Sequence, residues 1–484
     1  MAACCYNPKS RGISDNESCQ FGKEDLIEIE NVHFCRYHLP WSPEDLLGRF
    51  GINIGDDHPN RDRLKDRWSN DQKEKIRLQI LHHLNHGVDL SGVVAASDII
   101  VGEEARNILY PDALFPAKFE TRYSCGNVDL RRATFYGPAS FGGQITESLD
   151  LSCASFKDDV TFGSGRSFVN AELDKCRFAK TARFRNCQFV KSLSFKECVF
   201  EGLAQFERCE LGGADTVSFD GAQFRGPVSF RAGGEQNVNR AFFRNAVFEN
   251  DAGFEGRHFR SSLIFRGAKF SRAPRFQDAK ISFESVFPKL DGFLDWKTIP
   301  KGIDKKSEKE YYERASQAYR TLRYAMKEQD AYEEEARFWE LEMRAKAREL
   351  SWDKAGWLPK LFSFLYAATS RYGNSIGRPL AMWIIIWLCF IGVYALFHVG
   401  LSFEASWPYV EISDFSFQQT VRPFGVWSDE GGRRVAKLVF DNIPAMVPSG
   451  QILLVRLLAT AQSVISLSCI ALFGFALRRR FRMA

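Results

Sequence analysis

Between residues 128 and 288 the chain repeats itself with an uncommon period. Large apolar residues recur in alternating steps of five and six, and the sequence contains 43 Phe against 14 Tyr and 10 Trp. One run is Leu173, Phe178, Phe184, Phe189, Phe195, Phe200, Phe206 and Leu211, and another is Phe243, Phe248, Phe254, Phe259, Phe265, Phe270 and Phe276. Neither the helical period of 3.6 nor the strand period of 2 produces this pattern. A coil of short faces does, because about 22 residues then close one turn with the apolar side chains inside.

A small residue stands two positions before alternate members of this series. These positions hold Cys176, Cys187, Cys198, Cys209, Ala246 and Ala268. The pattern resembles the pentapeptide-repeat family, which implies a right-handed quadrilateral β-helix over 126–290, with interruptions at 212–217 and 232–240. About seven coils at the ~4.8 Å spacing of stacked strands give a rod of roughly 35 Å. We expect the four cysteines to pack as small core residues, with a metal or redox role as the alternative.

The amino-terminal segment, residues 1–40, contains a pattern of zinc ligands. Cys35 and His38 form a C-x2-H pair, which can bring two ligands to one ion from a tight turn. The predicted site is Cys5, Cys19, Cys35 and His38, with Cys4 as the alternative to Cys5. The string FCRYHLP also resembles a small Cys3His knuckle found in bacterial pentapeptide-repeat proteins. Such a zinc is structural, because four protein ligands leave no open position. Four unrelated reduced thiols are the alternative.

Residues 41–125 are expected to form a mixed α/β linker domain. In it, His82 and His86 lie one helical turn apart, but His83 replaces the Glu that a helical zinc-protease motif requires. A solvated helix face is the better interpretation. The sequence contains no P-loop, no dinucleotide-binding glycine motif after a strand and no nucleophile elbow. We therefore predict that the protein is not an enzyme and has no catalytic residues.

Residues 305–350 are rich in charge and predict a helical hairpin with its turn near 328–330. Apolar residues recur at helical spacing at Tyr312, Ala315, Tyr319, Leu322 and Met326. The string YRTLR and the later EARFWELEMRAKAR resemble a segment that joins pentapeptide repeats to membrane segments in bacterial proteins. The hairpin is either a spacer or a lever that couples the repeats to the membrane.

Residues 356–484 predict a membrane domain. It comprises an interfacial helix at 356–370 and two spans at about 380–399 and 452–477, which are apolar and close to the length that crosses a bilayer. Arginines precede the first span and follow the second, which indicates a multi-pass inner-membrane protein with both termini in the cytoplasm.

The segment 436–450 is a candidate re-entrant element between the spans. This order resembles two-span ion channels, and the string LFGFALRRRFRM resembles membrane-anchored pentapeptide-repeat proteins. No TVGYG-like filter is present, so a pore would have low selectivity. The predicted pore-lining residues are Asn442, Pro444, Ser449, Gly450, Thr460, Ser463 and Ser466. Hydrogen-bonded packing of helices is the alternative role for the polar residues of the second span.

These features predict a bacterial membrane protein in which a cytoplasmic repeat rod, bound by an unknown protein or ligand, controls an oligomeric channel-like pore. Two helices cannot enclose a conduit, so several copies are needed, and two-span channels suggest a tetramer. A non-conducting membrane-anchored interaction scaffold is the alternative. A DNA-mimic regulator of gyrase type is a weaker reading, because residues 128–288 contain 23 basic and 19 acidic residues. The net charge of +5 gives no reason to expect nucleic acid as a partner.

Overall fold

The computed structural model describes residues 27–29, 32–34, 38, 77–81, 93–95, 98–101, 108–163, 165–234, 236–293, 304–350, 357–399, 409–421 and 449–480. The chain divides into two compact units. The first comprises Met1–Asp304 with Gln317–Glu334, and the second comprises Lys305–Ser316 with Glu335–Ala484. The division passes through two helices, α4 (Lys305–Glu328) and α5 (Tyr332–Glu349), so each unit contains part of both.

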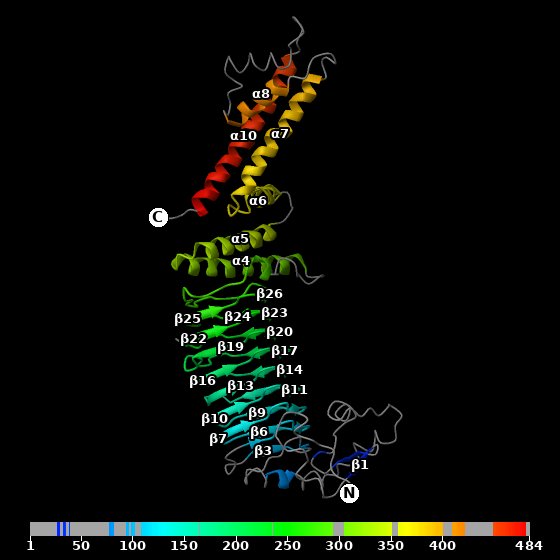
Figure 1. Cartoon of the computed structure of the whole chain (residues 1–484), viewed down its shortest axis with the longest axis vertical. Coiled ribbons are helices and arrows are strands. Elements are labelled where there is room, and N and C mark those ends of the chain that lie inside the picture. The colour runs from blue at the N-terminus through cyan, green and yellow to red at the C-terminus, as the bar shows by residue number, and fades with distance from the viewer. Residues whose placement is uncertain are drawn as a thin grey trace. The chain divides into compact units, whose positions relative to one another are not determined.

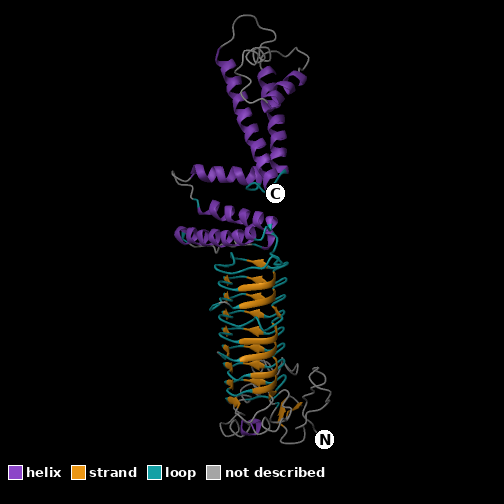
Figure 2. Ribbon diagram, turned by 90° about the vertical axis from the view of Figure 1, so that its left-hand side faces the viewer, coloured by secondary structure: helices purple, strands orange, loops and turns teal. Residues whose placement is uncertain are grey.

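The first unit is a β-solenoid built from three parallel sheets of eight strands each (Figures 1 and 2). One sheet contains β4 (Ile108–Leu109), β7 (Cys125–Asp129), β10 (Ile145–Asp150), β13 (Ser167–Glu172), β16 (Gln188–Ser194), β19 (Thr216–Ser218), β22 (Asn237–Phe242) and β25 (His258–Ile264). The second contains β5 (Leu114–Phe115), β8 (Thr134–Phe135), β11 (Ser155–Phe156), β14 (Arg177–Phe178), β17 (Val199–Phe200), β20 (Gln223–Phe224), β23 (Val247–Phe248) and β26 (Lys269–Phe270). The third contains β3 (Ile99–Val101), β6 (Phe119–Thr121), β9 (Ala139–Phe141), β12 (Val160–Phe162), β15 (Ala182–Arg183), β18 (Ala204–Gln205), β21 (Val228–Ser229) and β24 (Ala252–Gly253).

The core of the solenoid is a set of phenylalanine stacks. Phe178 is opposite Phe200 in the strand register, and their ring centroids lie 4.7 Å apart with nearly parallel planes. Phe195 is fully buried, stacks on Phe219 at 5.0 Å and meets Phe184 edge-on at 5.2 Å. Each ring therefore contacts rings in the same coil and in the adjoining coils. The prediction of a repeat solenoid is confirmed, while its right-handed, four-sided path stays a prediction.

Tight turns explain why every second inward position is small. The residue before the small position has a left-handed backbone at Lys175, Asn186, Glu197 and Arg208, with φ between 55° and 61°. The next residue then enters the core directly from the turn, where space is limited. Cys176, Cys187, Cys198 and Cys209 occupy these places and are at most 1% exposed.

The thiols also satisfy backbone carbonyls of the preceding coil. Cys176 donates to the Leu151 carbonyl at 3.0 Å, and Cys198 donates to that of Leu173 at 2.7 Å. Cys209 donates in the same way to Phe184. Burial raises the pKa of the Cys176 thiol well above its ordinary value, so it stays protonated at neutral pH. These contacts support core packing as the role of this cysteine.

Arg257 occupies the same kind of turn position as Cys209, yet its guanidinium is fully buried in the core. Its three nitrogens donate to the carbonyls of Phe230 at 2.5 Å, Cys209 at 2.6 Å and Phe206 at 2.8 Å. Burial lowers the pKa of Arg257 to about 10, which still leaves it charged at neutral pH. The side chain thus reaches back across two coils, past the interruption that the sequence shows at 232–240.

The backbone hydrogen bonds between the neighbouring coils explain why an arginine is needed here. In the preceding coil, the Cys187 carbonyl accepts the backbone N–H of Glu210 at 2.8 Å. The Arg257 guanidinium supplies a donor for the Cys209 carbonyl, next to the interruption. A buried carbonyl without a donor is costly, so one side chain compensates locally for the irregular coil.

The solenoid begins before residue 126, the first residue of the predicted repeat domain. Ile99–Val101 pairs in parallel with Phe119–Thr121, and Ile108–Leu109 pairs with β7. In these first coils Ile, Leu and Val take most of the inward positions that Phe occupies later. The alternating spacing of five and six residues is therefore hard to recognise in this part of the sequence. The only other strands among the described residues are β1 (Ile27–Ile29) and β2 (Val32–Phe34), an antiparallel pair.

Helix α4 contributes a cap to the last coil of the solenoid. That coil contains the short 3-10 helix η2 (Leu290–Gly292), followed by Phe293, whose ring lies 5.7 Å from Phe270. Tyr319 of α4 meets Phe293 edge-on at 5.8 Å, and the Gln329 side chain donates to the Ile281 carbonyl. The chain from 317 to 334 therefore belongs to the solenoid unit in its contacts as well as in its grouping.

The second unit is helical. Besides its parts of α4 and α5 it contains α6 (Trp357–Ser370), α7 (Gly377–Val399), α8 (Tyr409–Val421) and α10 (Ser449–Arg480). Helices α7, α8 and α10 all contact one another, and α6 contacts α7 and α10. The last two residues of the predicted re-entrant segment, 449–450, form the start of α10, and 436–448 lies outside the described residues.

Candidate functional site: a polar cluster among apolar helices

Two helices are long and apolar enough to cross a membrane. The qualifying stretches are Gly377–Ala395 in α7 and Leu453–Arg478 in α10, with mean hydropathies of 1.7 and 1.8. Only 11% and 28% of these stretches are buried. Large apolar side chains such as Leu388 and Leu457 are more than half exposed. A core helix of a soluble protein would cover such side chains, whereas a lipid environment suits them.

Helix α8 packs against both of these helices, which also contact each other (Figure 1). Its 13 residues extend for about 20 Å, which is shorter than the roughly 30 Å apolar thickness of a bilayer. Ile412 and Phe415 of α8 form one apolar cluster with Tyr394 of α7 and with Val455 and Ala459 of α10. The short helix α8 is thus held by buried side chains of both long helices, α7 and α10.

A fully buried glutamine joins the three helices. The Gln462 side-chain amide of α10 donates to the backbone carbonyl of Ser416 at 3.0 Å and to its hydroxyl at 2.9 Å. The Tyr394 hydroxyl of α7 donates to the other end of the same amide at 2.8 Å. Ser416 in turn donates to the Trp387 carbonyl at 3.2 Å. In an apolar surrounding such bonds fix α8 to both neighbours, because water cannot replace them.

The polar stripe predicted on the second span lies beside this glutamine. Ser463 is buried and donates to the carbonyls of Gln419 and Ala459, both at 2.9 Å. Thr460 is half-buried and donates to the Arg456 carbonyl one turn earlier at 2.8 Å. Ser466 is completely buried. Among the described residues, its hydroxyl and the Gln419 side-chain oxygen have no hydrogen-bond partner.

The structure describes only two of the other four predicted pore-lining residues. Ser449 and Gly450 form the first turn of α10, and Asn442 and Pro444 lie outside the described residues. The structure therefore places Thr460, Ser463 and Ser466 on α10 and bonds Ser463 directly to α8. A cluster of hydroxyl and amide groups can hold helices together or line water, and it offers oxygen ligands to a cation.

A second polar cluster links α5 to the turn between α6 and α7. Glu340 is 2% exposed, and its carboxylate accepts bonds from Arg344 at 2.5 Å and Arg371 at 3.1 Å. Asn374 donates to the same carboxylate at 3.3 Å and to the Ala336 carbonyl at 2.7 Å. We call these residues the Glu340 cluster. A buried carboxylate held by two guanidinium groups is a specific joint, because removal of one partner leaves a buried charge.

The turn at this joint has an unusual backbone. Arg371, Tyr372 and Gly373 are all left-handed, with φ of 48°, 57° and 83°. The Trp339 indole of α5 donates to the Tyr372 carbonyl at 3.0 Å, which helps hold this conformation. Two successive non-glycine residues in this region are strained by about 1–3 kcal/mol each. The strain lies in the turn between α6 and α7.

The predicted zinc ligands are mostly outside the described residues. These are Cys4, Cys5, Cys19 and Cys35. His38 is described, lies in a turn and is 2% exposed. Within the described part of the chain, no group of three or more His, Cys, Asp or Glu side chains could hold a metal ion.

Sequence reasoning missed α8 and the Glu340 cluster. The string YVEISDFSFQQTV mixes polar and apolar residues without a membrane signal, so it did not stand out between the spans. Glu340 and Arg344 are four residues apart in a charged helix, a spacing that usually indicates a solvated pair. Their burial depends on Arg371 and Asn374, which lie far along the chain.

Comparison with known proteins identifies the repeats. Residues 184–232 match the family model for pentapeptide repeats (9 copies). The prediction of pentapeptide repeats is thereby confirmed for this part of the solenoid. No curated protein and no solved structure matches the chain.

Proposed function

We propose, for a chain that combines a pentapeptide-repeat solenoid with two membrane-length helices, that the solenoid controls an oligomeric pore of low selectivity in a bacterial inner membrane. The observation that carries this proposal is α8, a helix too short to span and held against two apolar helices by polar bonds. A helix that ends inside a bilayer leaves backbone N–H and C=O groups unpaired at that end, and these are tolerated only where protein covers them or where they face water. A conduit formed by several copies provides such a place.

Buried polar atoms on α8 and α10 support a wet interior. Ser466 and the Gln419 side-chain oxygen have no partner among the described residues, although both are buried in one chain. Water or a hydrated cation can satisfy them. The Glu340 cluster supplies a route for control, since it ties α5 to the strained turn between α6 and α7. Movement of α5 would be transmitted to α7 through this joint.

A non-conducting membrane scaffold is the second candidate function. It is favoured by Gln462 and Ser463, whose bonds are all made within one chain. Polar groups used in this way stabilise the packing of membrane helices and need no pore. The two functions differ in one measurable property, which is solute flux.

Flux and accessibility at Ser466 test the proposal. Full-length protein with Cys389 and Cys469 replaced by alanine is placed in liposomes, and flux of small cations is followed with and without Ser466→Cys. We expect wild-type flux, and we expect a charged water-soluble thiol reagent to abolish it in the Ser466→Cys variant. The reason is that thiolates form and react readily only where water reaches them.

Leu467→Cys is the matched control, because Leu467 is the next residue and is 46% exposed on the apolar outside of α10. The reagent should leave its flux unchanged. Absence of flux in wild-type liposomes under every condition, or equal block of both variants, would leave the scaffold as the function.

We also propose a structural zinc ion at Cys5, Cys19, Cys35 and His38, with Cys4 as the alternative to Cys5. Metal analysis of the purified full chain should give about one zinc per chain, because a closed tetrahedral site holds one ion. Cys35→Ser should remove most of it. Cys153→Ser is the control, since Cys153 is an exposed free thiol of the solenoid and its loss should not change the zinc content. Zinc-free wild-type protein would contradict this prediction.

A further inference from the structure

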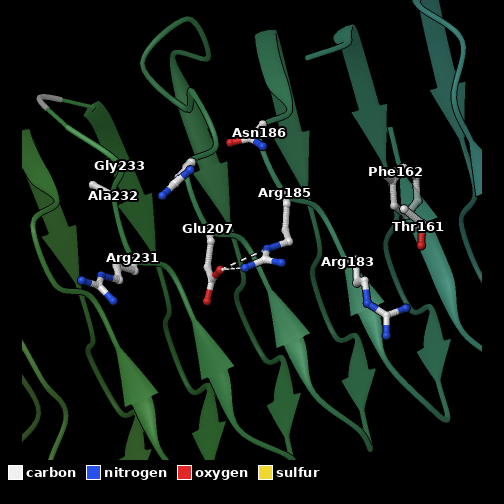
Figure 3. Close-up of a pocket in the computed structure, with 10 residues that line it drawn as sticks. Thr161, Phe162, Arg183, Arg185, Asn186, Glu207, Arg231, Ala232 and Gly233 are labelled. Carbon is white, nitrogen blue, oxygen red and sulfur yellow. Dashed lines mark hydrogen bonds and ion pairs between the residues drawn. The ribbon is translucent and has the colours of Figure 1, made fainter. Parts of the chain in front are cut away.

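We propose that the solenoid carries a binding site for a soluble phosphorylated small molecule. The site is a cavity of about 820 Å³ on one face of the coils, and Arg208 and Arg231 supply its positive charge (Figure 3). Arg183, Arg185 and Glu207 also line it. This inference is separate from the proposed pore, because binding can be measured without flux.

Most charge around the cavity is already balanced. Arg185 pairs with Glu207 at 2.6 Å, as Figure 3 shows, and Arg183 pairs with Asp159 at 3.0 Å. Elsewhere on the solenoid, surface arginines often find a carboxylate on an adjoining coil, as Arg177 does with Glu201 at 2.5 Å. Arg208 and Arg231 are exposed and form no ion pair with any described residue. Among the described residues, the cavity therefore presents two guanidinium groups without a carboxylate partner.

The wall of the cavity holds Arg208 in place. A Cβ on Gly233 would lie 2.6 Å from the Cγ of Arg208, so only glycine lets this loop lie against the arginine stem. Gln236 joins the same parts, because its side chain donates to the Arg208 carbonyl at 2.9 Å and accepts the Gly233 N–H at 3.2 Å. An arginine stem packed against backbone in this way has less side-chain freedom to lose when it binds a ligand.

Charge and size together indicate the ligand. A phosphate monoester carries close to two negative charges at neutral pH and matches two guanidinium groups, which bind phosphate oxygens in a bidentate manner. A cavity of this volume lies within the range of about 300–1,000 Å³ for small-molecule sites. Duplex nucleic acid fits less well, since it needs an extended basic surface and the solenoid is nearly neutral. A nucleotide-sized phosphorylated compound is the best match.

Binding of pyrophosphate and of ATP to the full-length protein in detergent tests this assignment by calorimetry. We expect saturable binding, and we expect Arg231→Ala and Arg208→Ala each to weaken it by about ten- to a hundredfold, the effect of losing one charge-assisted contact. Tighter binding of ATP than of pyrophosphate would assign part of the site to a nucleoside, and equal binding would assign it to phosphate alone.

Arg260→Ala is the control, because Arg260 is an exposed arginine of β25 outside the cavity and its loss should not change the affinity. All three side chains are on the surface, so each variant should melt at the wild-type temperature. The proposal is overturned by absence of saturable binding to either probe, by unchanged affinity in the Arg208→Ala, Arg231→Ala double variant, or by tighter binding of duplex DNA than of ATP.

Discussion

Phe195→Asp should destabilise the solenoid by about 4 kcal/mol or more, the largest effect we expect from any single substitution in it. The substitution removes a ring that contacts Phe184, Phe206 and Phe219 and places a carboxyl group in the cavity that remains. The group must either lose its charge or bury it without a partner. Hydrogen exchange of peptides from the surrounding coils should show loss of protection.

Lys196→Asp provides the matched control, because Lys196 is the next residue and is exposed. It introduces the same side chain on the outside of the coil, and its cost should stay below about 1 kcal/mol. Similar exchange in both variants would mean that the assignment of inward and outward positions is wrong.

Arg257→Met should destabilise the same unit by about 3 kcal/mol. Methionine fills part of the space but leaves the carbonyls of Phe206, Cys209 and Phe230 without their donor, at about 1–3 kcal/mol for each buried unsatisfied group. Release of the buried charge offsets part of this cost. Since the pKa of about 10 keeps Arg257 protonated throughout, the difference in denaturant midpoint should be constant between pH 6 and pH 9.

Arg260→Met is the control for Arg257→Met, because it removes an exposed arginine three residues away. Its effect should be within about 0.5 kcal/mol of zero. A variant at Arg257 that is as stable as wild type, or more stable, would show that desolvation of the guanidinium outweighs its three hydrogen bonds.

The sequence predicted the solenoid because its core consists largely of phenylalanine residues at a regular spacing along the chain. Where the spacing changes, prediction failed for physical reasons. The first coils use Ile99, Ile108 and Leu114, whose burial follows the same geometry without the phenylalanine pattern. Arg257 occupies an inward position at which the repeat predicts Cys or Ala. No neighbouring residue in the sequence explains the arginine. The arginine compensates for the interruption in the preceding coil, and only the three-dimensional structure shows that the two lie side by side.

The membrane-length helices were predictable from hydropathy, since most of their outward side chains are apolar. Helix α8 was not, because its position depends on Gln462 and Tyr394, which lie on other helices. The predicted polar stripe at Thr460, Ser463 and Ser466 was visible in the sequence. The bond from Ser463 to α8 was not, because a spacing pattern identifies a helix face but not what covers that face.

The cap on the last coil has a consequence for self-association. A parallel coil that simply ended would expose three strand edges, β24, β25 and β26, and another copy could add its own strands there and extend the ladder into a fibre. Phe293 closes this end from within the coil, and Tyr319 of α4 and Gln329 of the turn after it cover it further. Growth by strand addition at this end is therefore blocked by the chain itself. Copies that assemble must use a different surface.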